Sequence, residues 1–367
     1  MRYVVGLLAA GCLCFSGLAA APAPLAQATP PADDAIVEAP AKPTSKSKPA
    51  SAPTSHVATP PMWRIADDDT EIILLGTFHI LPPDVEWRSP ELGKAIDAAE
   101  EIWFEAEVDT PAAQAETVRV LKSEGFLKNG VRLSNLLEAE DAAKLEQIAE
   151  SLNVPASAID GMRPWQAFLI LSVELIKSKG FDPSAGLENR LLGEGRARGR
   201  DFVFLETVRQ QLGFFTQLAP EIERSLLTLT VRDWEKQIDE LDKLFAAWKA
   251  GDADAIDALM NETMRKEAPA VYEVLVVKRN KAWTERIKAA LESPGRKLIA
   301  VGAAHLVGAD GVPAMLEAQG IAAPRYGVAA NDNEESDLGA KGKPEKKKKN
   351  AQPAPEPAPL EEVMEPS

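Results

Sequence analysis

Four short apolar runs alternate with longer amphipathic stretches along the middle of the chain. They consist of β-branched, aromatic and leucine residues at strand length. Each run is nearly continuous rather than alternating, as in strands that are buried on both faces. They lie at 72–75, 102–104, 202–205 and 298–301. The pattern predicts four strands of one buried sheet.

The stretches between these strands have the periodicity and end signals of helices. The clearest start is Ser89-Pro90-Glu91, which offers an N-cap, a proline in the first turn and an early acid. We expect helices at 90–100, 111–125, 138–152, 164–179, 187–198, 207–216, 219–249 and 268–292. Strands separated by helices predict an α/β fold, with a mixed β-sheet core flanked by helices and a helical insertion.

The two ends of the chain lack this pattern. A short basic start and an uncharged apolar stretch through Ala20 are typical of a secretory signal peptide, which we expect over residues 1–28. Residues 29–62, rich in Pro and Ala, and the charged, Pro-rich residues 330–367 bury too little apolar surface to offset their chain entropy, so we expect both to be disordered. The sequence thus predicts one globular domain over residues 63–329, secreted across the inner membrane to the periplasm or the cell surface.

Composition narrows the range of functions. The formal net charge of −15 speaks against nucleic acid as a partner, because phosphate binding needs clustered Lys and Arg. Cys12 and Cys14 are the only cysteines and lie in the expected signal peptide, which excludes thiolate catalysis and zinc–thiolate sites from the mature domain. After the signal, no stretch has the roughly 18 apolar residues that span a bilayer, so we expect no transmembrane helix in the mature chain. Gly-x-Ser-x-Gly, phosphate-loop and His-Glu-x-x-His motifs are absent from the sequence.

Two of the three histidines follow strands in matching contexts. The run 72–75 leads into Gly76-Thr77-Phe78-His79, and the run 298–301 leads into Gly302-Ala303-Ala304-His305. A glycine just past a strand lets the backbone turn, so that an imidazole three residues on can point back over the strand's carboxyl end. Ligands bind at that edge in open α/β sheets. The matched pair favours a common site over two separate structural histidines.

The other two predicted strands run into carboxylates. Glu105 follows 102–104, with Glu107 two residues later and on the same face by the strand period, and Glu206 follows 202–205. A glutamate directly after an apolar run is costly to bury without a cation. Two imidazoles and a carboxylate are a credible ligand set for a divalent metal, whereas the alternative for each acid is a salt bridge or a helix cap.

Arginines provide possible partners for these acids. Arg279, on the expected helix 268–292, could neutralise an excess carboxylate or hold an anionic substrate group, and Arg163 at the start of another helix is a second candidate. A solvated helix face is the alternative for both. We interpret Trp165, Trp283 and Tyr272 as core residues rather than a substrate platform.

Together these motifs resemble the TraB/GumN family over about residues 63–328. The matching elements are Leu74-Leu75-Gly76-Thr77-Phe78-His79, Ile102-Trp103-Phe104-Glu105, Arg163-Pro164-Trp165, Gly186-Leu187-Glu188, Leu205-Glu206-Thr207 with Gln211, Arg279-Asn280 with Trp283, and Gly302-Ala303-Ala304-His305-Leu306-Val307-Gly308. The family is similar to the Tiki group of animal metalloproteases, which use paired Gly-x-x-His motifs and a Glu with a divalent metal, and more distantly to erythromycin-esterase-like and haem-binding ChaN-like proteins. The resemblance leaves open whether Glu105 or Glu107 is the site acid, because the family often has a single Glu-x-Asp unit here.

Two functions follow as expectations. The leading one is a metal-dependent, peptidase-like hydrolase of the cell envelope, acting on a peptide or small molecule. In it, His79, His305 and Glu105 hold a divalent cation (Mn, Co or Zn), Glu105 is a ligand or the general base, and Glu206 and Arg279 orient the site or the substrate. The alternative is a non-catalytic ligand- or haem-binding envelope protein on the same fold.

Overall fold

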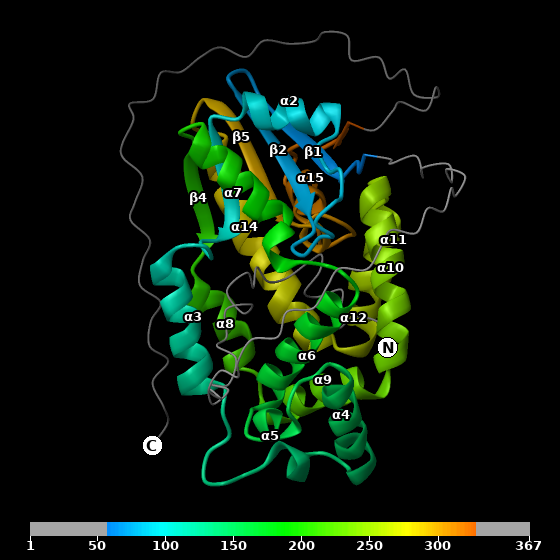
Figure 1. The fold of residues 1–367 in the computed structure, drawn as a ribbon. Coiled ribbons are helices and arrows are strands. Elements are labelled where there is room, and N and C mark those ends of the chain that lie inside the picture. Colours follow the sequence, from blue (N-terminus) through cyan, green and yellow to red (C-terminus); the bar gives the residue numbers. More distant parts are fainter. Residues whose placement is uncertain (1–56, 328–367) are drawn as a thin grey trace, which may run out of the picture. The chain divides into compact units, whose positions relative to one another are not determined.

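A computed structural model describes residues 57–327 of the chain (Figure 1). The expected signal peptide, most of the expected linker and the expected C-terminal tail lie outside the described residues. The folded part begins earlier than residue 63, because Ala58 is buried and its N–H donates to Glu86 O at 2.7 Å. The prediction of a disordered linker through residue 62 is therefore wrong for its last residues, which pack against the domain.

Six strands form one mixed sheet in the order β4-β3-β5-β2-β1-β6. They are β1 Met62–Ala66, β2 Thr70–Thr77, β3 Glu101–Ala106, β4 Asp201–Glu206, β5 Gly295–Gly302 and β6 Arg325–Tyr326. The four predicted strands are β2 to β5, and they pair in parallel with one another. The sequence pattern missed β1 and β6, which continue the sheet from β2 by antiparallel pairing. The predicted α/β class with a mixed sheet is confirmed.

The central strands are covered on both faces, and the edge strand is not. Residues 72–75 of β2 and 298–301 of β5 are buried, as their continuous apolar runs predict. In β4, residues 202–204 are only half-buried, because this strand has a neighbour on one side alone. The prediction of burial on both faces is therefore wrong for β4.

Between residues 90 and 216, six of the seven α-helices follow the predicted ranges closely. The seven are α2 Pro90–Ala98, α3 Pro111–Glu124, α4 Ala139–Ser151, α5 Ala156–Ile159, α6 Pro164–Ser178, α7 Leu187–Ala197 and α8 Val208–Thr216, of which only α5 was not predicted. Ser89 caps α2 as expected, since its hydroxyl accepts from Leu92 N at 3.2 Å.

The two long predicted helices are interrupted. The range 219–249 divides into α9 Pro220–Arg232 and α10 Trp234–Ala250, because the backbone of Asp233 (φ −103°, ψ 22°) leaves the helical region. The range 268–292 contains α13 Pro269–Tyr272, a π-helical segment Glu273–Val277 and α14 Lys278–Ala290. Also unpredicted are α11 Ala253–Asp257, a π-helical segment Ala258–Glu262, α12 Thr263–Glu267 and α15 Val312–Ala318.

The parallel strands end against the helices of the chain's middle part, while α2 and α7 lie along the sheet (Figure 1). The two regions share a core. The buried ring of Phe78, just past β2, lies 5.6 Å from the rings of both Phe245 and Trp248 in α10. Trp248 Nε1 also donates to Gly76 O at 2.9 Å. The carboxyl edge of the sheet is thus enclosed by helices. Within residues 57–327, no helix is both long and apolar enough to cross a membrane.

Candidate functional site

The strand ends place the predicted site residues close together in space. In the parallel register, Thr77 of β2 pairs with Gly302 of β5, and Ala106 of β3 pairs with Glu206 of β4. His305 ends a single 3₁₀ turn, Ala303–His305, that follows β5 directly. Residues distant in sequence therefore meet at one edge of the sheet, where open α/β sheets bind ligands.

Glu105 is the centre of the resulting cluster. Its carboxylate is fully buried, and Oε1 accepts from Gly302 N at 2.8 Å. The same oxygen lies 3.8 Å from His79 Nε2. The other oxygen, Oε2, accepts from Arg279 Nη2 at 2.7 Å and from Gln211 Nε2 at 3.1 Å. One carboxylate thus connects three strand ends to two helices.

His79 is backed by a second buried carboxylate, that of Glu188. Its Nδ1 lies 2.6 Å from Glu188 Oε1, which also accepts from the Thr77 hydroxyl. Burial opposes ionisation of Glu188, but the charge of His79 and the hydrogen bonds from His79 and Thr77 outweigh it, so the pKa of Glu188 is held below its ordinary value. An ionised Glu188 accepts only, so Nδ1 of His79 carries a hydrogen, and Nε2 is the ring nitrogen on the side of Glu105.

The start of α7 brings Glu188 to this position. Gly186 precedes the helix, and a Cβ there would stand 1.9 Å from His79 O, so the backbone approaches too closely for any side chain. Leu187 N then donates to Phe78 O at 3.3 Å. These contacts fix the first turn of α7 against the loop that follows β2.

His305 is held differently from His79. Asn280 Nδ2 donates to Asp310 O at 2.7 Å, so its Oδ1 is the atom that faces His305 Nδ1 at 2.6 Å. Because this oxygen accepts, His305 carries its hydrogen on Nδ1. The remaining nitrogen, Nε2, lies 3.1 Å from Arg279 Nη1 and accepts from it. The ring also packs on Trp283, with centroids 4.5 Å apart.

Arg279 binds both strand-end acids. Besides Glu105, it contacts Glu206 through Nε at 2.9 and 3.2 Å and through Nη2 at 2.8 Å. Its guanidinium lies over the rings of Trp283 (4.7 Å) and Phe214 (5.2 Å). Trp283 is buried in the core as expected, and its Nε1 also donates to Glu206 Oε1 at 3.1 Å, so this tryptophan contacts the cluster as well.

The cluster carries an excess of negative charge. The side chains of Glu105, Glu188 and Glu206 are 0%, 5% and 8% exposed, and they face the single guanidinium of Arg279, which is 1% exposed. With neutral imidazoles, the formal charges of these three carboxylates and this guanidinium sum to −2, and protonation of His79 makes the sum −1. The charge of Arg286 also acts on Glu206 from the partly exposed side. Such an excess is unfavourable unless a proton or a cation compensates it.

Two side-chain atoms of the cluster fit a cation directly. His79 Nε2 and Glu105 Oε1 are 3.8 Å apart, within the limit of about 4.2 Å for two ligands that are each about 2.1 Å from one ion. His305 is not available in this arrangement, because Arg279 donates to its Nε2. Accordingly, no group of three or more His, Cys, Asp or Glu side chains within residues 57–327 is arranged to hold a metal ion.

Two other candidates lie outside the cluster. Glu107 follows the end of β3 at Ala106, so the strand period that put it on the face of Glu105 no longer applies, and its charge acts on Arg196 instead. Arg163 pairs with Glu223 at a separate pocket. Among the tryptophans, Trp165 is fully buried, as expected for a core residue.

Sequence reasoning assigned no role to Glu188, Asn280 or Gln211. Each stands on a helix, where a polar residue usually indicates a cap or a solvated face. Only their place in the family motifs distinguished them, as Gly186-Leu187-Glu188, Arg279-Asn280 and Leu205-Glu206-Thr207 with Gln211. The signal that could have found Glu188 is its position two residues after a glycine that must lie against another backbone.

Comparisons with known proteins point to one family. The model of the TraB/PrgY/gumN family matches residues 61–325. The chain is similar to the uncharacterized protein YbaP of Escherichia coli (strain K12), with 26% identity over 246 residues, or 66% of this chain and 86% of YbaP. YbaP of Shigella flexneri matches with the same identity and coverage. No solved structure is significantly similar to the chain.

Proposed function

The chain belongs to the TraB/PrgY/gumN family, and from this premise we propose that it is a metal-dependent hydrolase. The single observation that carries the proposal is the buried excess of carboxylates over guanidinium groups beside a histidine whose Nδ1 donates to a carboxylate. Metal-binding histidines commonly have such a carboxylate partner, which fixes the ring and strengthens it as a ligand. A divalent cation would match the excess charge.

In this proposal His79 and Glu105 hold the ion, and His305 joins them once Arg279 releases its Nε2. Such an ion acts as a Lewis acid on a substrate carbonyl and makes water more acidic. Glu188 keeps the His79 ring in one tautomer, and Asn280 does the same for His305. Arg279, turned towards Glu206, is placed to hold an anionic group of the substrate.

Access to the cluster is from the β4 side. Glu206 and Phe214 are the members of the site that keep solvent-exposed surface, whereas both histidines are buried. We therefore expect the substrate, a peptide or another small molecule with a hydrolysable carbonyl, to enter past these two residues. From the sequence alone, we place the enzyme in the periplasm or at the cell surface, after removal of residues 1–28.

The test is metal analysis of the purified protein beside histidine variants. We expect about one Mn, Co or Zn ion per chain after dialysis, a loss of that ion in His79→Ala and a weaker affinity in His305→Ala. His56→Ala is the matched control, because His56 is the third histidine of the chain and lies outside the described residues. Equal metal content in wild type and His79→Ala, or no retained ion, would refute the metal proposal.

One observation favours a second candidate, hydrolysis without a metal. Arg279 already supplies a cation to Glu105, Glu206 and His305, and a proton that His79 takes up from a reacting water would remove a further part of the excess negative charge. In that case neutral His79, oriented by Glu188, is the general base. Hydrolysis of ester or peptide substrates would then survive chelation by EDTA, yet disappear in Glu188→Gln.

Haem binding, the non-catalytic alternative, is tested by titration with haem. The described cavities of about 420 and 460 Å³ are lined by other residues than the two histidines.

A further inference from the structure

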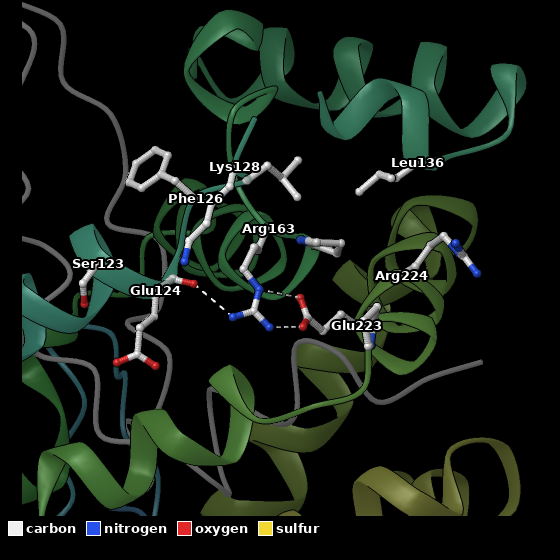
Figure 2. A pocket seen from close by; sticks show the side chains of 11 residues that line it. Ser123, Glu124, Phe126, Lys128, Leu136, Arg163, Glu223 and Arg224 are labelled. Carbon is white, nitrogen blue, oxygen red and sulfur yellow. Dashed lines mark hydrogen bonds and ion pairs between the residues drawn. The ribbon is translucent and has the colours of Figure 1, made fainter. Parts of the chain in front are cut away.

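A second pocket lies at Arg163-Pro164-Trp165, a motif that the histidine cluster does not use. The pocket has a volume of about 420 Å³ and lies between the end of α3, the loop 125–132, and the starts of α6 and α9 (Figure 2). Small-molecule sites usually measure roughly 300–1,000 Å³. The apolar part of its wall is formed by Phe126, Leu127, Leu136, Pro164 and Pro220.

The floor of the pocket is a closed ion pair. Arg163 Nε donates to Glu223 Oε2 at 3.2 Å, and its Nη2 donates to the other oxygen of the same carboxylate (Figure 2). The remaining donors of Arg163 bind Glu124 O and Thr216 O, both at 3.1 Å. Glu223 is only 2% exposed. Since these groups satisfy one another, the floor gives the pocket shape without adding net charge.

The mouth of the pocket exposes apolar surface. Phe126 is 42% exposed, and Val131, on the same loop, is also 42% exposed. These are two of the four large hydrophobic side chains that are exposed within residues 57–327. Asn129 (φ 58°) and Gly130 (φ 71°) form the tight turn that presents them. An apolar ligand would remove Phe126 from water.

The rim is positively charged in an acidic protein. Glu124 pairs with Arg209 at 3.7 Å and Glu223 pairs with Arg163, so both acids that line the pocket are compensated. By contrast, Lys128 and Arg224 make no ion pair or side-chain hydrogen bond with any residue that the structure describes. Two cations at the rim can therefore pair with an anionic ligand, although the chain as a whole carries a net charge of −15.

We propose that this pocket binds a single-chain amphiphilic anion, an aliphatic carboxylate. The chain lies against the apolar wall below Phe126, and the carboxylate pairs with one of the two rim cations, Lys128 or Arg224, which stand on opposite sides of the Arg163–Glu223 pair (Figure 2). The combination of an apolar cavity with two unpaired cations at its rim selects against neutral and cationic amphiphiles of the same chain length, because only an anion gains from the rim charge. The site is separate from the histidine cluster and does not depend on the proposed hydrolysis.

The test is calorimetric titration of the full chain with sodium dodecanoate below its micelle concentration. We expect saturable binding of one molecule per chain, and roughly fifteenfold weaker binding of decanoate, because decanoate lacks two methylenes and each buried methylene contributes about fourfold. Dodecyl maltoside and dodecyltrimethylammonium have the same chain with a neutral or cationic head. Equal affinity for either of them would overturn the proposal. Binding to anionic vesicles without binding to monomeric dodecanoate would also overturn it, and would assign the loop to a membrane surface.

Charge-reversal variants locate the binding. We expect Lys128→Glu/Arg224→Glu to weaken dodecanoate binding at least tenfold, and Phe126→Ser to weaken it several-fold. Neither change touches a buried side chain, so both variants should fold. Lys179→Glu/Lys281→Glu is the matched control, since it makes the same change in net charge at exposed positions outside the pocket. Equal affinities of the two double variants would refute the assignment. His79→Ala should bind dodecanoate like wild type, which separates this test from that of the proposed hydrolase.

Discussion

Replacing Arg279 by methionine tests the electrostatic account of the cluster most directly. The side chain is 1% exposed and compensates two buried carboxylates, Glu105 and Glu206, while donating to His305 Nε2. Methionine fills much of the volume but removes the only guanidinium of the cluster. Breaking a buried ion pair by removing one partner typically costs about 3–5 kcal/mol, because the remaining charge stays buried.

We therefore expect Arg279→Met to lower the free energy of unfolding by about 3–5 kcal/mol at pH 7. At roughly 2–4 °C per kcal/mol for a domain of this size, the melting temperature should fall by about 6–20 °C. Urea unfolding followed by circular dichroism measures the first quantity and a thermal scan the second. Arg286→Met is the matched control, since this arginine is on the same helix, is exposed, and donates to the carbonyls of Phe204 and Leu205 at 2.9 and 2.7 Å. Arg286→Met should lower the free energy of unfolding by no more than about 1 kcal/mol.

A double-mutant cycle with Glu206→Gln separates the ion pair from simple packing. If Arg279 acts mainly through charge, the loss in Arg279→Met should shrink by at least about 1 kcal/mol when Glu206 is already neutral. Purely additive losses in the cycle, or a loss in Arg279→Met no larger than that in Arg286→Met, would refute the claim that the buried charges need this cation.

Three further predictions concern the supports of the two histidines. Glu188→Gln should destabilise the domain at neutral pH. Because the pKa of Glu188 is lowered on folding, the urea midpoint of this variant should lie below that of wild type at every pH above about 4.5, and the difference should narrow as the pH falls further. A difference that stays constant with pH would argue against the ion pair. Gly186→Ala should destabilise by at least about 2 kcal/mol in thermal unfolding, since its Cβ would stand 1.9 Å from His79 O, while Gly193→Ala, with open space around its Cβ, should not. Asn261→Ala should lower the free energy of unfolding in urea by about 1–3 kcal/mol, because Asn261 Nδ2 donates to Ala304 O (2.9 Å) and Val307 O (3.3 Å) in the loop that carries His305. An unchanged urea midpoint would show that these two hydrogen bonds do not stabilise the loop.

The fold could be predicted from the sequence where burial and periodicity agree. Strands β2, β3 and β5 are covered on both faces, so each gives an uninterrupted apolar run. The strand β1 has no uninterrupted apolar run, because Arg64 and Ala66 are exposed among its five residues. The break at Asp233 is invisible for another reason. One non-helical residue between α9 and α10 leaves the apolar period on either side intact.

The candidate site could be predicted only in part, for a related reason. Glu105 and Glu206 lie at the carboxyl ends of β3 and β4, and His79 and His305 come shortly after β2 and β5. Parallel strands in one sheet must bring their carboxyl ends to a common edge. Glu188 follows no strand, and its one local signal is Gly186 two residues earlier. Its role depends on how closely α7 approaches the loop after β2, a tertiary distance that no sequence spacing encodes.

The two Gly-x-x-His motifs look equivalent in sequence, yet their surroundings make the histidines chemically different. The partner of His79 is an ionised carboxylate, which strengthens Nε2 as a ligand or a base. The partner of His305 is a neutral amide, and its Nε2 already accepts from a guanidinium. Loss of His79 should therefore abolish any reaction at this site, whereas loss of His305 mainly frees Arg279 to turn fully towards Glu105 and Glu206. The repeated motif thus reflects the shared geometry of two parallel strand ends, while the helices α7 and α14 assign a separate task to each imidazole.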